Sequence, residues 1–456
     1  MSFRALVKKL IPRALFVRVE PYGHWLEAIV ENVLFGFPAR KLKVIGVTGT
    51  AGKTTTCTLL THMLRHSNYK VAMMTTISVD YGDGKGARPN TTRMTSVGSL
   101  KLIKAVKRML ANNVEWLVLE TTSQALAQHR VWGVPYTVVG FTNLSHDNID
   151  YHGSFENYRA AKVRLFTQCN RNRRGLRTGV VNADDPNADY FIRAIKHPVT
   201  YGIQRGDLRA HDIRQLPNGS QFVARIGDDE YHVTSHLPGA FNVYNCLAAI
   251  GIARSVGLTI EQIEQGITGL EQVNGRMNEI NEGQDFGVIV DYAPTPVAFT
   301  NVFDAVEPIV KGRIIVVFGS AGRRDNLKRP IQGEIAGKRA DIVILTEEDD
   351  RDQDGLKIME EIAAGAVKAG KVKEKDLFLI HDRAEAVERA ITMAKKDDMV
   401  LILGKGEETV IITNKPGHKT SPGHIYNEDT DTVRRPYNDS DTARSVLRKL
   451  AKTPKE

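Results

Sequence analysis

The chain contains two sets of short apolar runs. In the segments between most of these runs, the apolar residues fall at helical spacing. The β-rich runs of the first set are residues 44–48, 71–75, 116–120, 138–143 and 179–182. Those of the second set are residues 287–292, 314–319, 342–346 and 399–404, separated by helical stretches near 296–309, 327–339, 356–369 and 383–395. This alternation is typical of mostly parallel sheets that helices cover on both faces. The pattern predicts an α/β fold.

A segment of different character joins the two sets. Residues 220–237 have the alternation of a polar antiparallel hairpin, and residues 242–256 that of a helix. Residues 274–284 are polar and contain glycine, so we expect a hinge there. We therefore predict three parts, residues 1–42, 43–277 and 278–456. The tail from Lys449 to Glu456 is expected to fray.

Residues 1–42 stand apart from both sets. Their apolar residues fall at helical spacing at positions 25, 26, 29, 30, 33 and 34, and basic residues precede them. One interpretation is an amphipathic helix whose residues 22–35 contact a membrane surface or a partner. The other is a helix packed on the main body. We favour packing, because Pro12 and Pro21 would break a long interfacial helix.

Composition and charge narrow the class of protein. The 456 residues are 42% hydrophobic and 25% charged, which is typical of a folded protein with two or three domains. We see no apolar run of membrane-spanning length, no secretory signal, and three scattered cysteines, which together predict a cytoplasmic location. The net charge of +9 is spread along the chain. Spread charge favours a surface that tolerates anionic substrates over a nucleic-acid interface.

The sharpest local signal is the sequence GVTGTAGKTT at residues 46–55. It follows a β run and opens a helix, the setting in which backbone N–H groups cradle phosphate. Lys53 can reach the β- and γ-phosphates, and the Thr54 hydroxyl can bind Mg²⁺. Glu120, at the end of another predicted strand, is placed as a further oxygen ligand for Mg²⁺, although an ordinary strand-end acid is the alternative. The loop predicts ATP binding and does not by itself choose a reaction.

The loop and the motifs after it resemble the Mur ligase family, and within it the MurE type. The matching segments are ETTSQAL at 120–126, FTNLSHDNIDYHG at 141–153, ENYRAAKVRLF at 156–166, LPGAFNVYN at 237–245, GRM at 275–277, DYA at 291–293, GSAGRRD at 319–325 and GKG at 404–406. The likeness runs from about residue 43 to about residue 447. It implies a P-loop ATPase domain with a mostly parallel sheet, followed by a Rossmann-like C-terminal domain.

The resemblance also implies a reaction and its residues. An ATP-dependent ligase of this type turns a carboxylate into an acyl phosphate, which an amine then attacks, adding an amino acid to a muramyl peptide. Lys53, Glu120 and Lys162 would be catalytic, with Lys162 carbamylated by CO₂. Two Mg²⁺ ions would bind through Thr54, Glu120, Asn148 and Lys162. ATP would contact Gly49, Thr50, Gly52, Lys53, Thr54, Thr55, Asn242, Asn245, Arg276 and Asp291. The donor would contact Thr95, Ser96, Thr122, Ser123 and Arg130. The amino acid would contact Arg324, Asp349, Arg351, Gly404 and Glu408.

The chain departs from the family pattern at several positions. About 43 residues precede the phosphate loop, so we expect the uridine-nucleotide-binding domain to be missing and the donor to be altered or lipid-linked, or a partner to supply the missing contacts. Asn148 and Pro294 each replace a motif histidine, and the motif proline is Asn274. The amino-acid selector is EDDR at 348–351, and GKGHE is GKGEE at 404–408. The added acids favour a cationic amine such as lysine or diaminopimelate.

Two other functions stay open. One is another ligase on the same scaffold, such as a folylpolyglutamate synthase or a poly-amino-acid ligase, against which the motifs at 141–166 argue. The other is a nucleotide-binding regulatory protein without turnover, which Asn148 favours and which intact Lys53, Glu120 and Lys162 oppose. We expect a monomer and no nucleic-acid partner.

Overall fold

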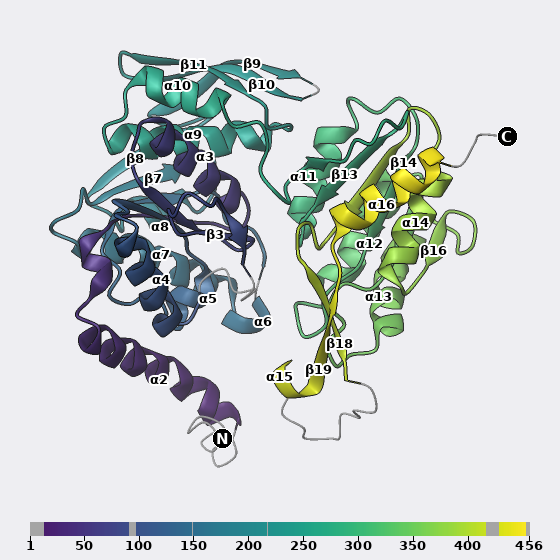
Figure 1. Cartoon of the computed structure of the whole chain (residues 1–456), viewed down its shortest axis with the longest axis horizontal. Helices are drawn as coiled ribbons and strands as arrows, with labels where there is room; N and C mark the ends of the chain where they lie inside the picture. Colours follow the sequence, from purple (N-terminus) through teal and green to yellow (C-terminus); the bar gives the residue numbers. More distant parts are fainter. Residues whose placement is uncertain (1–12, 91–96, 148, 217, 416–427, 453–456) are drawn as a thin grey trace. The chain divides into compact units, whose positions relative to one another are not determined.

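The computed structural model describes residues 13–90, 97–147, 149–216, 218–415 and 428–452 (Figure 1). The chain divides into two compact units. The first comprises residues 1–214, 220–235 and 241–270, and the second comprises residues 215–219, 236–240 and 271–456. The second unit takes over at Glu271, seven residues before the predicted boundary at 278, so Arg276 belongs with the second unit.

The first unit is built on an 11-stranded sheet in the order β11-β10-β9-β8-β7-β6-β1-β5-β2-β3-β4. Its strands are β1 (Lys43–Thr48), β2 (Val71–Met74), β3 (Ser78–Asp80), β4 (Arg88–Pro89), β5 (Trp116–Glu120), β6 (Tyr136–Phe141), β7 (Thr178–Asn182), β8 (His197–Gly202), β9 (Leu208–Leu216), β10 (Gly219–Ile226) and β11 (Asp229–Ser235). β1 lies between β5 and β6 and is parallel to both. The loops that leave these three strands at their carboxyl ends therefore meet at one edge, where ligands of such sheets bind.

Helices cover both faces of this sheet. One face carries α3 (Lys53–His66), α9 (Phe241–Ser255) and α10 (Ile260–Thr268), which pack on one another (Figure 1). The other carries α4 (Ser99–Ala111), α5 (Ser123–Ala127), α7 (Phe155–Arg171) and α8 (Ala188–Ile192), around a core with Val44, Leu117, Val139 and Phe141 at its centre. The short helix α6 (Ile149–His152) precedes α7, and α2 (Arg13–Leu34) and the turn η1 (Pro38–Lys41) precede β1.

The second unit has a six-stranded sheet in the order β12-β13-β17-β14-β15-β16. Its strands are β12 (Asn278–Glu279), β13 (Gly287–Asp291), β14 (Ile314–Phe318), β15 (Ile342–Leu345), β16 (Leu377–Leu379) and β17 (Met399–Leu403), parallel from β13 onward. The helices are α11 (Pro296–Val306), α12 (Lys328–Arg339), α13 (Gly355–Lys368), α14 (Arg383–Met393), α15 (Glu428–Asp431) and α16 (Asp439–Lys452). A separate antiparallel ribbon pairs β18 (Val410–Asn414) with β19 (Thr432–Pro436).

The predicted α/β class and both sets of strands are confirmed, with ends displaced by one or two residues. Two expectations are wrong. α2 runs through Pro21, because a proline removes one helical hydrogen bond and the neighbouring residues can continue the helix around it. The expected fraying is wrong for residues 449–452, which are helical because Val446 and Leu447 are buried against the second core, while residues 453–456 lie outside the described residues. Among the described residues, no helix is long and apolar enough to cross a membrane.

Candidate active site

The phosphate loop occupies the turn between β1 and α3 in the first unit. Two of its glycines, at positions 49 and 52, have positive φ angles of 153° and 80°. A Cβ on Gly49 would lie 1.9 Å from the Thr142 Oγ1, and a Cβ on Gly52 would lie 2.2 Å from the Asn245 Oδ1. Both positions therefore require glycine for space as well as for conformation. The loop passes against the end of β6 on one side and against α9 on the other.

Glu120 lies beside this loop because β5 pairs with β1 in a register that sets it opposite Val47. Its Oε2 accepts hydrogen bonds from the Thr54 hydroxyl at 2.9 Å and from the Thr76 amide at 3.0 Å. The Lys53 Nζ is 4.0 Å from its Oε1. The Glu120 side chain is 1% exposed. A buried carboxylate and hydroxyl beside a phosphate cradle are oxygen donors of the kind that Mg²⁺ prefers, so these residues fit the ion.

Lys162 reaches the same loop from α7. Its Nζ donates a hydrogen bond of 2.6 Å to the Gly49 carbonyl, and the side chain is buried. Burial lowers the pKa of the Lys162 ammonium well below its ordinary value, and the Lys53 charge lowers it further. Asp147 and Glu120 act in the opposite direction. The shift is in the direction of the neutral amine.

The segment after β6 holds the loop in place, which sequence reasoning did not assign. The Asn143 side chain accepts a hydrogen bond from the Ala51 amide at 2.9 Å, and the Thr142 hydroxyl donates to the Ala51 carbonyl at 2.6 Å. The Thr50 hydroxyl pairs with that of Tyr158 at 3.0 Å. All three supporting residues lie in the motifs at 141–153 and 156–166, and this position in the motifs could have identified them as site residues.

Part of the predicted donor site surrounds α5. Thr122 caps this helix by accepting a hydrogen bond from the Ala125 amide, and the Ser123 hydroxyl pairs with the His152 Nε2 at 3.0 Å. Burial, with the charges of Lys162 and Arg164, lowers the pKa of His152 to about 4, so this imidazole is neutral near pH 7. Arg130 lies in the turn that follows α5, where its amide donates to the Ala125 carbonyl. The predicted contacts Thr95 and Ser96 and the predicted metal ligand Asn148 lie outside the described residues.

The predicted nucleotide contacts divide between the units. Asn242 and Asn245 lie on α9 in the first unit, joined by a hydrogen bond of 2.8 Å. Arg276 and Asp291 belong to the second unit, where Asp291 ends β13. Its two carboxylate oxygens each accept a backbone N–H at 2.7 Å, from Met277 and Ala293. Burial raises the pKa of Asp291, although Arg276 and these amides oppose the shift.

The second unit places the predicted amino-acid contacts around Lys405, which was not among the predicted site residues. The Lys405 Nζ is 3.0 Å from the Asp349 Oδ1 and 2.8 Å from the Glu408 Oε2, and its side chain is fully buried. Burial by itself would lower the pKa of Lys405, but Glu408, Asp349 and Glu348 hold it above its ordinary value. Gly404, next to it, has a φ of 109° and lies against Glu348.

The two arginines predicted to bind the amino acid differ. Arg324 is exposed. Its charge lowers the pKa of Tyr292, against the rise that burial and Glu408 cause. Arg351 is buried, and its NH1 donates a hydrogen bond of 2.6 Å to the Gly322 carbonyl. Its Nε is 3.4 Å from a Glu428 carboxylate oxygen. Arg324 is therefore the arginine with more freedom to meet a ligand.

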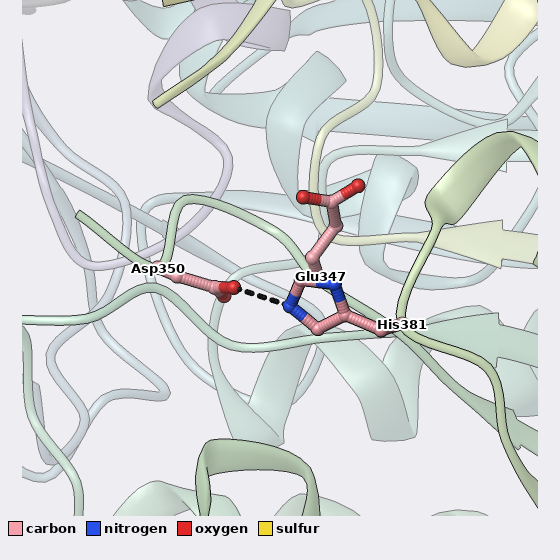
Figure 2. A group of neighbouring side chains, drawn as sticks. All are labelled: Glu347, Asp350 and His381. Atoms are coloured by element: carbon pink, nitrogen blue, oxygen red, sulfur yellow. Dashed lines mark hydrogen bonds and ion pairs between the residues drawn. The ribbon is translucent and has the colours of Figure 1, made fainter. Parts of the chain in front are cut away.

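Figure 2 shows a neighbouring group made of Glu347, Asp350 and His381, in which the His381 Nε2 lies 2.8 Å from the Asp350 Oδ2. This pair raises the pKa of His381. Glu347 forms an ion pair with Arg435. A Cβ on Gly355 would lie 2.1 Å from Asp350 and 2.3 Å from His381, so a glycine there lets the pair approach. The Asp350–His381 pair thus joins the loops after β15 and β16, and Glu347 pairs with Arg435 of β19.

Comparison with known proteins gives the family. Residues 47–253 match the Mur ligase middle domain, and residues 275–406 match the Mur ligase glutamate ligase domain. The chain is 35% identical over 406 residues to UDP-N-acetylmuramoyl-L-alanyl-D-glutamate–2,6-diaminopimelate ligase 1 of Clostridium acetobutylicum, covering 88% of this chain and 80% of that protein. It is 38% identical over 390 residues to the UDP-N-acetylmuramyl-tripeptide synthetase of a Roseiflexus species, covering 83% and 76%. The chain belongs to the Mur ligase family.

Solved structures show the same Mur ligase architecture. A UDP-N-acetylmuramoyl-L-alanyl-D-glutamate–2,6-diaminopimelate ligase aligns with a TM-score of 0.58 at 29% identity, covering 90% of this chain and 79% of that one. The folylpolyglutamate synthase of Mycobacterium tuberculosis aligns with a TM-score of 0.67 at 14% identity, covering 83% and 92%. The second likeness concerns the fold alone.

For this Mur ligase, the predicted residues of the first unit form one group around the loop. Lys53, Thr54, Glu120 and Lys162 lie together there, and Asn245 touches the loop at Gly52. The predicted contacts Asp349, Gly404 and Glu408 form a second group in the other unit. Membership of the family makes this chain an ATP-dependent carbon–nitrogen ligase.

Proposed function

We propose that this Mur ligase adds an amino acid to the carboxylate of a muramyl peptide through an acyl phosphate. The observation that supports this most is the convergence of Lys53, Glu120 and Lys162 on the phosphate loop. ATP would supply the phosphoryl group that turns the donor carboxylate into an electrophile. The amine of the amino acid would then attack that carbon and release phosphate, forming the amide.

The loop residues would bind and orient the triphosphate. Backbone N–H groups at the start of α3 would face the triphosphate, and Lys53 would add a cation to them, whereas the Thr50 and Ala51 amides are hydrogen-bonded to Asn143. Thr54 and Glu120 would hold Mg²⁺, which neutralises phosphate oxygens when bound. Asn148 and Lys162 are proposed for a second ion. Asn242, Asn245, Arg276 and Asp291 would contact the nucleoside and phosphates.

Lys162 is proposed to react with CO₂. Its neutral Nζ would form a bond to the CO₂ carbon and release a proton to water, leaving a carbamate anion. Its burial and its lowered pKa favour the unprotonated amine that this step needs. The carbamate would give the site a negative oxygen ligand in place of an amine. Its charge would also attract the ammonium of Lys53.

The two substrates are proposed to use different units. The muramyl peptide donor would contact Thr122, Ser123 and Arg130, together with Thr95 and Ser96. The amino acid would meet Arg324 and the group at Asp349, Arg351, Gly404 and Glu408. Glu348 is half-buried in that group, and loss of hydration raises its pKa, while Lys328 and Lys405 act against the shift. This density of acids supports an amino acid with a second amine, such as lysine or diaminopimelate.

The experiment is phosphate release from ATP with a panel of muramyl dipeptide donors, both nucleotide-linked and lipid-linked, and a panel of amino acids. Release that requires both a donor and an amine supports the proposal. Release with folate or polyglutamate substrates would assign another ligase of this scaffold instead. Tight ATP binding without release across the panel would make the chain a nucleotide-binding protein without turnover.

Lys162→Ala tests the carbamate within the same assay. The variant should lose at least about 100-fold in rate, because a charged group at the transition state is removed. Formate or acetate should restore part of it by supplying a carboxylate in the vacated space. Lys162→Arg is the matched control, since it fills the space and cannot be rescued. Full activity of Lys162→Ala would contradict the carbamate.

A further inference from the structure

Helix α2 is packed with its apolar side facing outward. Tyr22, Leu26, Ile29 and Val33 follow one another at intervals of three or four residues and form one stripe along the helix. Tyr22 is 69% exposed, and Leu26 and Val33 are each 61% exposed. Val30 and Leu34 lie beside this stripe and are also exposed. We call these six residues the outer face of α2.

The opposite side of the helix fixes it to the first unit. Ala28 and Asn32 are buried, and the Asn32 Nδ2 donates to the Trp132 carbonyl at 3.2 Å. A Cβ on Gly133 would come within 2.7 Å of the Asn32 Oδ1. α2 also packs on α4. The Trp25 ring, 41% exposed, lies 6.3 Å from the His129 ring on this side. The fully buried anchoring residues are thus an alanine and an asparagine, whereas a helix packed on a core normally buries its large apolar residues.

The exposed apolar residues are concentrated here. Among the described residues, six of the 21 large hydrophobic side chains that are exposed lie within residues 22–34. Single exposed hydrophobic residues are ordinary, but a continuous patch of this kind marks a contact surface. The prediction that packing on the main body accounts for this helix is therefore incomplete, because packing leaves its apolar side uncovered.

The charge of residues 1–18 indicates which kind of partner covers the outer face of α2. Residues 1–18 contain Arg4, Lys8, Lys9, Arg13 and Arg18 and no acid. Such a run is attracted to anionic lipid headgroups by about 1 kcal/mol for each cation near the surface. Tyrosine, present here as Tyr22, is one of the side chains favoured at the boundary between headgroups and acyl chains. We propose that the outer face of α2 lies in the surface of an anionic lipid bilayer and holds the enzyme there as a peripheral protein.

The test is co-sedimentation of the full chain with large unilamellar vesicles of phosphatidylcholine, with and without 30% phosphatidylglycerol (about one lipid in three, enough for a negative surface potential). We expect binding to the anionic vesicles that weakens as salt rises, and at least about tenfold weaker binding to neutral vesicles. The double variant Leu26→Glu/Val33→Glu should bind anionic vesicles at least about tenfold more weakly, because two apolar side chains would no longer be buried in the bilayer.

Leu176→Glu/Ile260→Glu is the matched control, since both residues are exposed on the first unit away from α2. Its vesicle binding should equal that of the natural chain. ATP affinity and far-ultraviolet circular dichroism check that each variant is folded. The proposal is overturned if the natural chain stays in the supernatant with anionic vesicles, or if the α2 variant binds them equally well. It is also overturned if the outer face instead mediates self-association in sedimentation velocity without lipid binding. No substrate enters the assay, so its result is independent of the proposed reaction.

Discussion

Among the described residues, each unit buries one lysine at the carboxyl edge of its sheet, and the pKa values of the two are shifted in opposite directions. Lys162 is 2% exposed and Lys405 is fully buried, so both suffer a similar loss of hydration. The pKa of Lys162 is lowered, whereas that of Lys405 is raised. Burial is common to both residues and therefore cannot account for the difference.

The difference comes from the neighbouring charges. Lys162 shares its surroundings with another cation, Lys53, whose charge opposes its own. Lys405 has direct ion pairs with Asp349 and Glu408 and a third acid nearby. The acids around Lys405 thus outweigh its loss of hydration, whereas Asp147 and Glu120 near Lys162 do not outweigh burial and the Lys53 charge.

Two histidines repeat the contrast. His152 in the first unit has its pKa lowered to about 4 by burial and by the charges of Lys162 and Arg164. His381 in the second unit has its pKa raised by the hydrogen bond to Asp350, in spite of partial burial. At His152 burial and the nearby cations act in the same direction, whereas at His381 the hydrogen bond to Asp350 outweighs burial.

The largest expected effect comes from replacing each buried lysine by methionine. Lys405→Met should lower the free energy of unfolding of the second unit by about 3–5 kcal/mol, because Asp349 and Glu408 would lose the cation that compensates them in a buried site. Lys162→Met should change that of the first unit by less than about 1 kcal/mol, since the lost hydrogen bond to Gly49 is offset by removal of a desolvated cation.

Hydrogen exchange measured by mass spectrometry separates these two free energies, because it reports on peptides of each unit. Equal losses of unfolding free energy in both variants would contradict a role for the neighbouring charges, because burial alone would then explain both lysines.

Gly52→Ala tests the phosphate loop of the first unit. The left-handed conformation costs alanine about 1–2 kcal/mol, and its Cβ would also collide with the Asn245 Oδ1. We expect at least about tenfold weaker ATP binding in isothermal titration calorimetry. Gly84→Ala is the matched control, since Gly84 has a φ of 74° with nothing within 4 Å of the added Cβ. Equal effects of the two variants on ATP binding would rule out the collision.

The smallest expected effects concern pH. The folded pKa of His152 lies below its ordinary value of 6.5, so its contribution to stability is present above pH 6.5 and is lost as pH falls toward 4. The folded pKa of His381 is raised, so its contribution is present below pH 6.5 and is lost as pH rises through the folded value. Each slope is at most about 1.4 kcal/mol per pH unit.

His152→Gln should therefore flatten the stability profile of the first unit between pH 4 and 6.5, where the unfolded chain binds more protons. His381→Gln should flatten that of the second unit above pH 6.5 and leave the acid side unchanged. Guanidinium denaturation at a series of pH values, followed by hydrogen exchange for each unit, measures both. Slopes of the same sign for the two histidines would contradict opposite surroundings.

Sequence reasoning located the first site more completely than the second. The loop, Glu120 and Lys162 lie in motifs with fixed spacing, and parallel pairing of β5 with β1 was enough to bring Glu120 to the loop. Lys405 was missed as a site residue although it stands inside the motif at 404–406. Its importance depends on Asp349, 56 positions away, and on Glu408, so no local pattern shows it. Strands β8 and β9 and the ribbon β18–β19 were also missed, because their apolar periodicity is weak.

By itself, the sequence determined the α/β class, the phosphate loop and the order of the motifs, because these depend on local periodicity and on short spacings. Only the tertiary structure decided that Lys162 meets the Gly49 carbonyl, that Arg351 is buried against Gly322, and that α2 turns its apolar side outward. Side-chain burial and charge neighbours are set by contacts between residues far apart in the chain. The pKa of a lysine and the exposure of a helix face follow from those contacts.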